Sequence, residues 1–371
     1  MAKQGSGHKN WLWLLLLVII VVGYHIYPRQ NTSIPTPAVK GISTAVSSYG
    51  SIFEVYFTDP QFPFDGVYTG GIEQYLIEKI NNAKSSIDVA VYQFDLESVV
   101  QALINAKNRG VDVRVVYDND YADPAKISEL ENAGIKAIPD DRSAFMHNKF
   151  FVFDDQCLWT GSFNITENAA YKNDENALYF CSDDAAENYT TEFSEMFAGQ
   201  FGPSSSANTP YPIFTVDGIN IENYFAPEDD VMDKVVAAVA TAKSSIQFMA
   251  YEFTDNSLGQ ALEQKFADGL SVEGIFESSQ ANSQYSQCAP LLKKGISVYL
   301  DGNPAVFHHK VMIIDDSIVI TGSFNFTQQA NKENDENLLI IHDPGLAATY
   351  EKEYQLMKSQ AAKPTSDTCK K

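Results

Sequence analysis

The sequence predicts an α/β protein assembled from two copies of one structural unit. The spacing His-x-Lys-x4-Asp occurs twice, at His147 and at His308, and the surrounding letters recur at the same offset of 161 residues. Within each copy, helical and strand-like hydrophobic patterns alternate, which is typical of α/β units. The chain of 371 residues has room for roughly two domains. A repeat at a fixed offset indicates duplicated structure before any chemistry is considered.

The N-terminal residues predict a membrane segment. An unbroken apolar run covers 11–22, follows two lysines, and extends less purely to Tyr27. Such a run after a basic flank is typical of a cleaved signal peptide or of an uncleaved signal anchor. No clear Ala-x-Ala cleavage site follows, so we expect residues 1–28 to be a cytoplasmic tip and a transmembrane helix. The rest of the chain would then be membrane-anchored and extracytoplasmic, or secreted if the segment is cleaved.

The first unit is predicted to occupy residues 51–201, after a linker over 29–50 that is rich in Ser, Thr and Pro. Apolar residues alternate from Ile52 as in a strand, and the apolar positions of 70–83 have helical spacing. The next elements expected are a strand over 87–94, a helix over 96–109 and a strand over 111–117. This order of elements makes the unit α/β.

The second unit repeats this plan in residues 213–358. Three serines and three prolines in 202–212 predict the linker between the units, and 359–371 is interpreted as a tail. A helix is expected over 231–242, and Lys-Ser-Ser-Ile then leads into a strand, as it does in the first unit. Here the offset is two residues shorter than at the motif, so one connecting loop should differ in length between the units.

The motif is predicted to lie on a β-hairpin followed by a third strand. The expected segments are strands over 147–153, 157–160 and 176–180 with a turn at 154–156, and strands over 308–314, 318–321 and 337–341 with a turn at 315–317. Side chains alternate along a strand, so His147 and Lys149 should point to the same face. One face can therefore carry the histidine and the lysine together.

The repeated residue types supply the functional groups that cleavage of a phosphodiester needs. The attacked phosphate gains negative charge, so the site needs a nucleophile, an acid for the leaving oxygen, and fixed donors. A neutral imidazole can attack phosphorus while a protonated one donates to the departing alcohol, and a carboxylate can hold the distal ring nitrogen. The candidates for these catalytic roles are His147, His308, Glu175 and Glu336. The candidates for holding phosphoryl oxygens are Lys149, Lys310, Asn164 and Asn325.

These residues resemble the signature of the phospholipase D superfamily, a duplicated His-x-Lys-x4-Asp followed by Gly-Ser-x-Asn, over about 52–354. The resemblance implies two homologous α-β-α sandwich lobes related by pseudo-twofold symmetry, with one active site at their interface. It also implies a metal-independent mechanism through a phosphohistidine, without a cofactor. By position, His147 is the expected nucleophile and His308 the expected acid. The signature adds Ser162 and Ser323 to the phosphate-binding candidates, and it gives Asp154 and Asp315 a structural role.

Family resemblance does not fix the substrate. The formal net charge of −22 argues against a protein that coats duplex nucleic acid. A membrane-anchored, acidic catalyst has phospholipid headgroups close at hand, so hydrolysis or transphosphatidylation of phospholipids is favoured over the alternative, a membrane-anchored nuclease. A cleft lined by further Lys or Arg would favour nucleic acid instead. No obligate protein partner is expected, and both copies of the motif are complete, which disfavours a non-catalytic scaffold.

The cysteines, one further histidine and four aromatic residues allow more limited predictions. Cys157 and Cys181 lie on expected neighbouring strands and could form a disulfide, although four unpaired thiols are equally compatible, and Cys288 and Cys369 have no obvious partner. His309 is not expected to bind a metal, because adjacent strand residues point to opposite faces. Four aromatic residues end the two equivalent strands and are interpreted as core rather than as cleft lining; they are Tyr92, Phe94, Tyr251 and Phe253.

Overall fold

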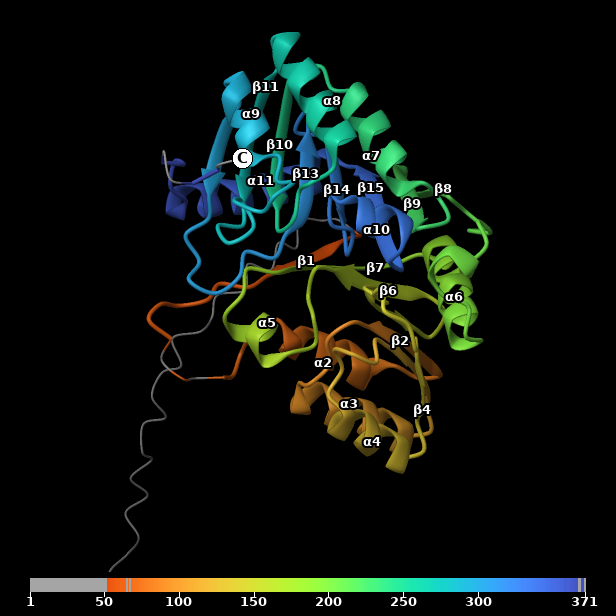
Figure 1. Ribbon diagram of the computed structural model, residues 1–371. Helices are drawn as coiled ribbons and strands as arrows, with labels where there is room; N and C mark the ends of the chain where they lie inside the picture. The colour runs from red at the N-terminus through yellow and green to blue at the C-terminus, as the bar shows by residue number, and fades with distance from the viewer. Residues whose placement is uncertain (1–51, 65, 67, 366–367, 370–371) are drawn as a thin grey trace, which may run out of the picture. The chain divides into compact units, whose positions relative to one another are not determined.

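The computed structural model describes residues 52–64, 66, 68–365 and 368–369 (Figure 1). The predicted transmembrane segment, residues 1–28, and the linker that follows it lie outside this part, so both stay predictions. Among the residues that are described, no helix is both long enough and apolar enough to cross a bilayer. Each predicted unit forms a sheet of its own, and the units are called repeat 1 and repeat 2 below.

The sheet of repeat 1 has seven strands. They are β1 (Glu54–Phe57), β2 (Ser86–Val91), β3 (Asp112–Tyr117), β4 (Lys136–Pro139), β5 (Lys149–Phe153), β6 (Cys157–Gly161) and β7 (Asn176–Cys181). Their order in the sheet is β1-β7-β6-β5-β2-β3-β4. Strands β2, β3 and β4 are parallel, and the other neighbours pair antiparallel. The sheet is therefore mixed, and the motif hairpin β5–β6 lies near its centre.

The sheet of repeat 2 has eight strands. They are β8 (Ile213–Val216), β9 (Ile219–Ala226), β10 (Ser245–Ala250), β11 (Ser271–Phe276), β12 (Ser297–Leu300), β13 (Lys310–Ile314), β14 (Ile318–Gly322) and β15 (Glu336–His342). Their order is β12-β11-β10-β13-β14-β15-β9-β8, which is the order of repeat 1 with one strand added beside β9. The alternating pattern that predicted the first strand of repeat 1 thus has its counterpart in β9, while the hairpin β8–β9 was not predicted.

Helices cover both faces of each sheet. They are α2 (Glu73–Asn82), α3 (Glu97–Asn108), α4 (Pro124–Asn132), α5 (Glu167–Tyr171) and α6 (Asp183–Phe197) in repeat 1, and α7 (Val231–Ala240), α8 (Asn256–Ala267), α9 (Cys288–Lys294), α10 (Gln328–Lys332) and α11 (Pro344–Gln360) in repeat 2; a 3-10 turn, η1 (Gly202–Ser204), follows α6. Figure 1 shows α2, α3 and α4 outside one sheet and α7, α8 and α9 outside the other. The predicted α/β class and the two α-β-α lobes are confirmed.

The hydrophobic core is divided into three clusters. Two of them fill the space between a sheet and its outer helices, one in each repeat. The third is shared: it contains Tyr189 and Phe193 of α6, Tyr350 and Tyr354 of α11, and apolar side chains from the inner faces of both sheets. Because burial of apolar area is the main favourable term in association, this shared cluster holds the two repeats together. The motif strands β5 and β13 both border it.

Two disulfides cross-link this framework. Cys157 and Cys181 are directly paired on β6 and β7 and form a disulfide, which the sequence allowed. Cys288 and Cys369, for which the sequence showed no obvious partner, form a disulfide with each other. The physical reason is that the chain after α11 returns to repeat 2, where Ala362 pairs with Leu300 at the end of β12. Sequence separation alone could not indicate this return.

Candidate active site

The two motif histidines are held at the contact between the repeats. His147 precedes β5, and its backbone N–H donates to the carbonyl of Asp335 in repeat 2 at 2.9 Å. In the same way the N–H of His308, which precedes β13, donates to the carbonyl of Asp174 in repeat 1 at 2.9 Å. Each histidine therefore has its backbone fixed by the other repeat, which places both side chains at one interface.

The predicted glutamates pair with the histidines across this interface. His147 Nδ1 lies 2.7 Å from Glu336 Oε2, and His308 Nδ1 lies 2.9 Å from Glu175 Oε2. Each carboxylate thus bonds the histidine of the other repeat. A carboxylate at Nδ1 fixes the tautomer and the orientation of the ring, and it favours the positively charged form. The bond leaves Nε2 as the ring atom that can react.

The predicted serines support these glutamates. Ser162 Oγ donates to Glu175 Oε2 at 2.6 Å, and Ser323 Oγ donates to Glu336 Oε2 at 2.7 Å. Each hydroxyl also accepts a backbone N–H from the first asparagine of the next strand, Asn176 or Asn337. Both serines are fully buried and do not line the pocket. The structure therefore gives them a positioning role, and their contact with phosphate stays a prediction.

The two motif lysines lie beside the histidines, buried from solvent. Lys149 Nζ donates to the carbonyl of His147 at 2.6 Å, and Lys310 Nζ donates to that of His308 at 2.7 Å. Each ammonium also lies over a tyrosine ring, with Lys149 5.0 Å from the Tyr92 centroid and Lys310 4.7 Å from the Tyr251 centroid. Burial lowers the pKa of Lys149 to about 7 and that of Lys310 to about 8. An anionic substrate beside them would restore full protonation.

Burial also shifts the pKa values of the candidate acid–base groups. It lowers the pKa of His147 and His308 well below the usual value, with a further contribution from the lysines. It raises the pKa of Glu175 and of Glu336 to about 8. In both cases the cause is that a buried charged form loses its hydration. Strongly shifted groups gathered in one cavity are typical of a catalytic site.

The histidines open into one pocket of about 370 Å³ that both repeats line. Its lining is Tyr92, Gln93, Tyr121, Phe145, His147, Asn164 and Asn173 from repeat 1 and Tyr251, Glu252, Val306, His308, Asn325, Thr327, Gln329 and Asn334 from repeat 2. The predicted asparagines Asn164 and Asn325 are therefore placed in the pocket. Their Oδ1 atoms are buried without a hydrogen-bond partner within the described part of the chain, which leaves these side chains available to a ligand.

The motif aspartates lie at the far end of each hairpin, away from this pocket. Asp154 accepts the backbone N–H groups of Lys84, Ser85 and Ser86, and its equivalent Asp315 accepts those of the matching Lys-Ser-Ser segment in repeat 2. These bonds join the hairpin to the strand beside it. The structure therefore gives both aspartates a structural role.

His309 is buried behind the site and belongs to the packing between repeats. Its Nδ1 lies 2.9 Å from Asn176 Nδ2, which donates to it. Burial lowers the pKa of His309 to about 3, so the ring is neutral. Among the residues that the structure describes, no group of three or more His, Cys, Asp or Glu is arranged to hold a metal ion.

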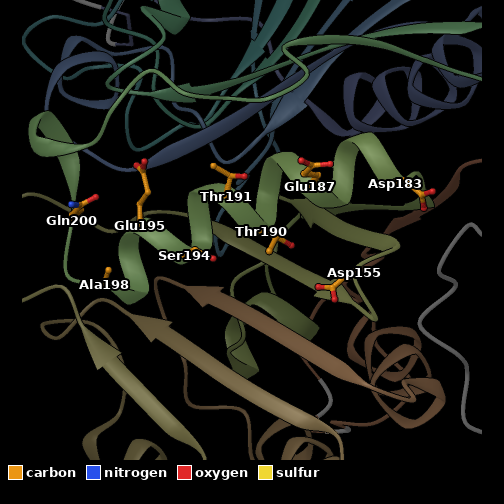
Figure 2. A pocket seen from close by; sticks show the side chains of 9 residues that line it. All are labelled: Asp155, Asp183, Glu187, Thr190, Thr191, Ser194, Glu195, Ala198 and Gln200. Atoms are coloured by element: carbon orange, nitrogen blue, oxygen red, sulfur yellow. The ribbon is translucent and has the colours of Figure 1, made fainter.

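A separate hollow of about 580 Å³ runs along α6 and contains none of the motif histidines or lysines (Figure 2). Acidic side chains dominate it, among them Asp183, Glu187 and Glu195, which project from the helix. Its lining includes four carboxylates and no lysine or arginine, so it would repel a phosphate and is not counted in the candidate catalytic site.

The family model described as cardiolipin synthase, PLD-like domain matches residues 76–197 and 224–358, which is more than half of the chain. The chain belongs to the phospholipase D superfamily. Membership of this superfamily makes the protein a phospholipase D-like phosphodiesterase. The duplicated motif that predicted the family lies within the two matched segments.

Individual proteins also match parts of the chain. A phospholipase D of Rickettsia bellii (strain RML369-C) is 34% identical over 140 residues, which is 38% of this chain and 70% of the relative. A mitochondrial cardiolipin hydrolase of Xenopus tropicalis is 29% identical over 127 residues, 34% of this chain and 60% of the relative. The crystal structure of phosphatidylserine synthase from Haemophilus influenzae Rd KW20 aligns with a TM-score of 0.64 at 16% identity, over 79% of this chain and 85% of that one. The last match shows a shared fold alone.

Two functional residues of this phospholipase D-like site were missed in the sequence. Tyr92 and Tyr251 were interpreted as core, but both line the pocket, and their rings contact His147 and His308 with centroids 4.7 and 4.8 Å apart. Their neighbours Phe94 and Phe253 are core residues, as expected. The available signal was position, because each tyrosine directly follows the strand that pairs with the motif strand.

Proposed function

We propose that this phospholipase D-like enzyme cleaves the headgroup ester of phospholipids, by hydrolysis or by transfer of the phosphatidyl group to another alcohol. The observation that carries the proposal is the pair of His–Glu bonds across the repeats, which orients two imidazoles toward one pocket. Displacement at phosphorus needs a nucleophile on one side and an acid on the other, and two oriented imidazoles supply both. The names of the relatives, phospholipase D and cardiolipin hydrolase, support a phospholipid substrate.

In the proposed mechanism His147 is the nucleophile. Its Nε2 forms a bond to phosphorus while the bond between phosphorus and the headgroup oxygen breaks. His308, protonated at Nε2, gives its proton to that oxygen, and the headgroup leaves as an alcohol. Water then attacks the phosphohistidine and gives a proton to His308, which releases phosphatidic acid and restores His147. The scheme requires no metal, because the chain itself supplies the nucleophile, the acid and the donors for phosphate.

The histidines must hold opposite protonation states before the first step. Burial lowers the pKa of both rings in the empty site, so His147 is neutral and ready to attack. A bound diester brings a negative charge next to His308 and thereby raises the pKa of that ring. Lys149 and Lys310, with Asn164 and Asn325, would stabilise the charge that develops on the phosphoryl oxygens. Substrate binding itself thus favours the protonated form of His308, which can then act as the acid.

Phospholipid is favoured over nucleic acid by the charges around the pocket. The residues that line the pocket include no lysine or arginine, and they include one carboxylate, Glu252. A nuclease binds neighbouring phosphates of the strand with cations along its groove. The whole chain has a formal net charge of −22, which adds to the repulsion of a polyanion. Nucleic acid stays the alternative substrate, and a nuclease the alternative activity.

We further propose that the enzyme is anchored in a membrane with its catalytic part on the extracytoplasmic side. The apolar run at 11–22 supports the anchor, and the two disulfides support an oxidising compartment. Sodium carbonate washing of membranes from cells that express the full chain would test the anchor. Retention in the washed pellet, with cleavage of the catalytic part by protease added from outside, is expected. Release into the medium would instead indicate a cleaved signal peptide.

The substrate is tested by comparing two phosphodiesters with one preparation. The full-length protein in detergent is given phosphatidylcholine vesicles and single-stranded DNA in parallel, with a chelator present and His308→Asn as the blank. Release of phosphatidic acid that the blank lacks is the expected result. Cleavage of DNA alone would replace the proposed substrate by nucleic acid, and loss of all activity with the chelator would overturn the metal-independent scheme.

A further inference from the structure

A second hollow continues from the catalytic pocket across the surface of repeat 2. Its volume is about 520 Å³, and its lining is Glu252, Thr254, Asn256, Gln280, Ser283, Tyr285, Thr327, Gln328 and Gln329. Three of these residues, Glu252, Thr327 and Gln329, also line the catalytic pocket. The two hollows are therefore contiguous, and a ligand bound at the histidines can extend into the second one, called the repeat 2 groove below.

Repeat 1 has an equivalent hollow of about 510 Å³, which offers an internal comparison. Its lining is Tyr68, Asp95, Leu96, Glu97, Ser98, Glu167, Asn168 and Tyr171. It shares no lining residue with the catalytic pocket. By the repeat, Asp95 is equivalent to Thr254, Glu97 to Asn256 and Glu167 to Gln328. Three carboxylates of repeat 1 are thus replaced by a hydroxyl and two amides in the hollow that joins the active site.

This replacement removes charges that would repel an anionic substrate. The repeat 2 groove is lined by amides, hydroxyls and a tyrosine, with a single carboxylate at its junction with the catalytic pocket. No lysine or arginine is among its lining residues, so the groove has no cation for a second phosphate. Amides and hydroxyls both donate and accept hydrogen bonds, which suits a ligand that carries several neutral hydroxyl groups. Tyr285, which is 67% exposed, adds a flat apolar face at the rim.

The groove lies on the side of the pocket where the proposed reaction releases the alcohol. His308, the proposed acid, belongs to repeat 2 and gives its proton to the departing alcohol. The groove begins at Glu252, one residue after Tyr251, whose ring contacts His308. The departing alcohol therefore has its closest polar binding surface on repeat 2. The other side of the pocket is more apolar, with Tyr92, Tyr121 and Phe145 in mutual contact.

We infer that the repeat 2 groove binds the alcohol part of the substrate, and that this alcohol is a neutral polyhydroxyl headgroup of the glycerol, inositol or sugar class. The inference rests on the proposed phospholipid function and names its substrate class. Hydrogen bonds from the groove select the headgroup, while the motif residues act on the phosphate common to all phospholipids. A site that forms hydrogen bonds with hydroxyl groups discriminates against a ligand that lacks them, because the buried polar groups of the site are then left without partners.

The test compares two short-chain lipids that stay monomeric in water, dihexanoyl-phosphatidylglycerol and dihexanoyl-phosphatidylcholine. Monomeric substrates remove the difference in surface charge between vesicles. The full-length protein is expected to show a kcat/KM at least about tenfold higher for the glycerol lipid, a factor that roughly 1.4 kcal/mol of differential binding provides. Equal values, or a preference for the choline lipid, would overturn the inference while leaving the proposed function in place. Cleavage of DNA without cleavage of either lipid would overturn both.

A matched pair of variants locates the selectivity. Gln328→Ala removes a groove side chain, and Glu167→Ala changes the equivalent position in repeat 1; both residues are exposed, so the fold should be kept. Gln328→Ala is expected to lower the preference for the glycerol lipid about threefold to tenfold, and Tyr285→Ala should act in the same direction. Glu167→Ala is expected to leave the ratio unchanged. Equal effects of Gln328→Ala and Glu167→Ala would show that the groove does not bind the headgroup.

Discussion

At the scale of single residues, the site is a balance of buried charges. Two glutamates, two histidines and two lysines are withdrawn from water at one interface, and burial disfavours the charged form of each of them. A diester that enters this pocket adds one negative charge beside two lysines whose pKa values are lowered by burial. Binding of substrate therefore relieves an electrostatic strain that the empty site carries. In the proposed scheme the two imidazoles then supply the nucleophile and the acid.

Replacement of either imidazole should stop turnover. His147→Asn and His308→Asn are each expected to lower kcat by about a thousandfold or more, since one removes the nucleophile and the other the acid. An aryl phosphodiester, whose leaving group needs no proton, should separate the roles. With this substrate His308→Asn should accumulate a phosphohistidine at His147, detectable by mass spectrometry of a peptide. Normal activity in either variant, or a label on another residue, would contradict the two-histidine scheme.

The buried glutamates predict a pH dependence of stability. Burial raises the pKa of Glu336 to about 8, whereas the same group in the unfolded chain titrates near 4.5. Between these values the folded state binds more protons, so the stability from this group is present below pH 4.5 and is lost as the pH rises to about 8. In Glu336→Gln this loss is absent. Its free energy of unfolding, measured in urea, should therefore rise relative to the parent between pH 5 and 8, at the scale of ~1 kcal/mol or more. A difference that does not change with pH would show that Glu336 is ionised throughout.

The residues that the structure gathers at the candidate site could be predicted from sequence, and their pairing could not. Repetition of His, Lys, Asn and Glu at a fixed offset is visible in the letters. The bond from His147 to Glu336 joins the two repeats, so no spacing within one repeat encodes it. The hydrogen bonds from Ser162 and Ser323 to the glutamates could not be predicted either, because the signature does not indicate the partner of these hydroxyls. Only the packing between repeats decides these partners.

At the scale of elements, each motif hairpin is fixed at its turn by an aspartate. Asp154 and Asp315 adopt left-handed backbone angles, with φ of 55° and 53°, and both accept hydrogen bonds from the segment that starts the neighbouring strand. Asparagine and aspartate tolerate this conformation better than most residues. The hairpin and the strand β2 or β10 are thereby held in register, which keeps the histidine at the opposite end in place.

The turn aspartate should affect stability and leave the chemistry unchanged. Asp154→Ala removes acceptors from the backbone N–H groups of Lys84, Ser85 and Ser86. The expected cost is about 1–3 kcal/mol in the free energy of unfolding, with kcat per folded molecule unchanged. Thermal melts and activity on one preparation would show both effects, and Asp315→Ala should give a similar loss. A fall in kcat without a lower melting temperature would place the aspartate in the reaction.

The elements with strong local patterns could be predicted from sequence. The helix expected over 96–109 is α3, Glu97–Asn108, and the strand expected over 111–117 is β3, Asp112–Tyr117. The hairpin β8–β9 was missed, because its first strand is short and mostly exposed and carries little periodicity. The disulfide from Cys288 to Cys369 was missed for another reason: it depends on the path of the chain after α11. The local amino-acid sequence does not indicate that path.

At the scale of the whole molecule, the repeats are joined by a symmetric set of polar bonds as well as by the shared core. Thr160 Oγ1 donates to Asn337 Oδ1 at 2.7 Å, and Thr321 Oγ1 donates to Asn176 Oδ1 at 3.0 Å. Each of these asparagines directly follows one of the paired glutamates, Asn176 as the first residue of β7 and Asn337 as the second residue of β15. Contacts between the repeats thus determine where Glu175 and Glu336 lie. One chain contains both halves of the site, and each half is incomplete without the other.

This arrangement predicts that two differently inactivated chains do not rescue each other. A chain with His147→Asn retains His308, and a chain with His308→Asn retains His147, so an active site would form from a mixture only if repeats were exchanged between chains. The shared core and the bonds across the interface oppose such an exchange, because both would have to be broken first. Mixing the two purified variants, or expressing them together, should therefore give no more activity than either alone. Recovery of about a quarter to a half of the parent activity would instead show that sites assemble between chains, and a concentration-dependent recovery would identify exchange after folding.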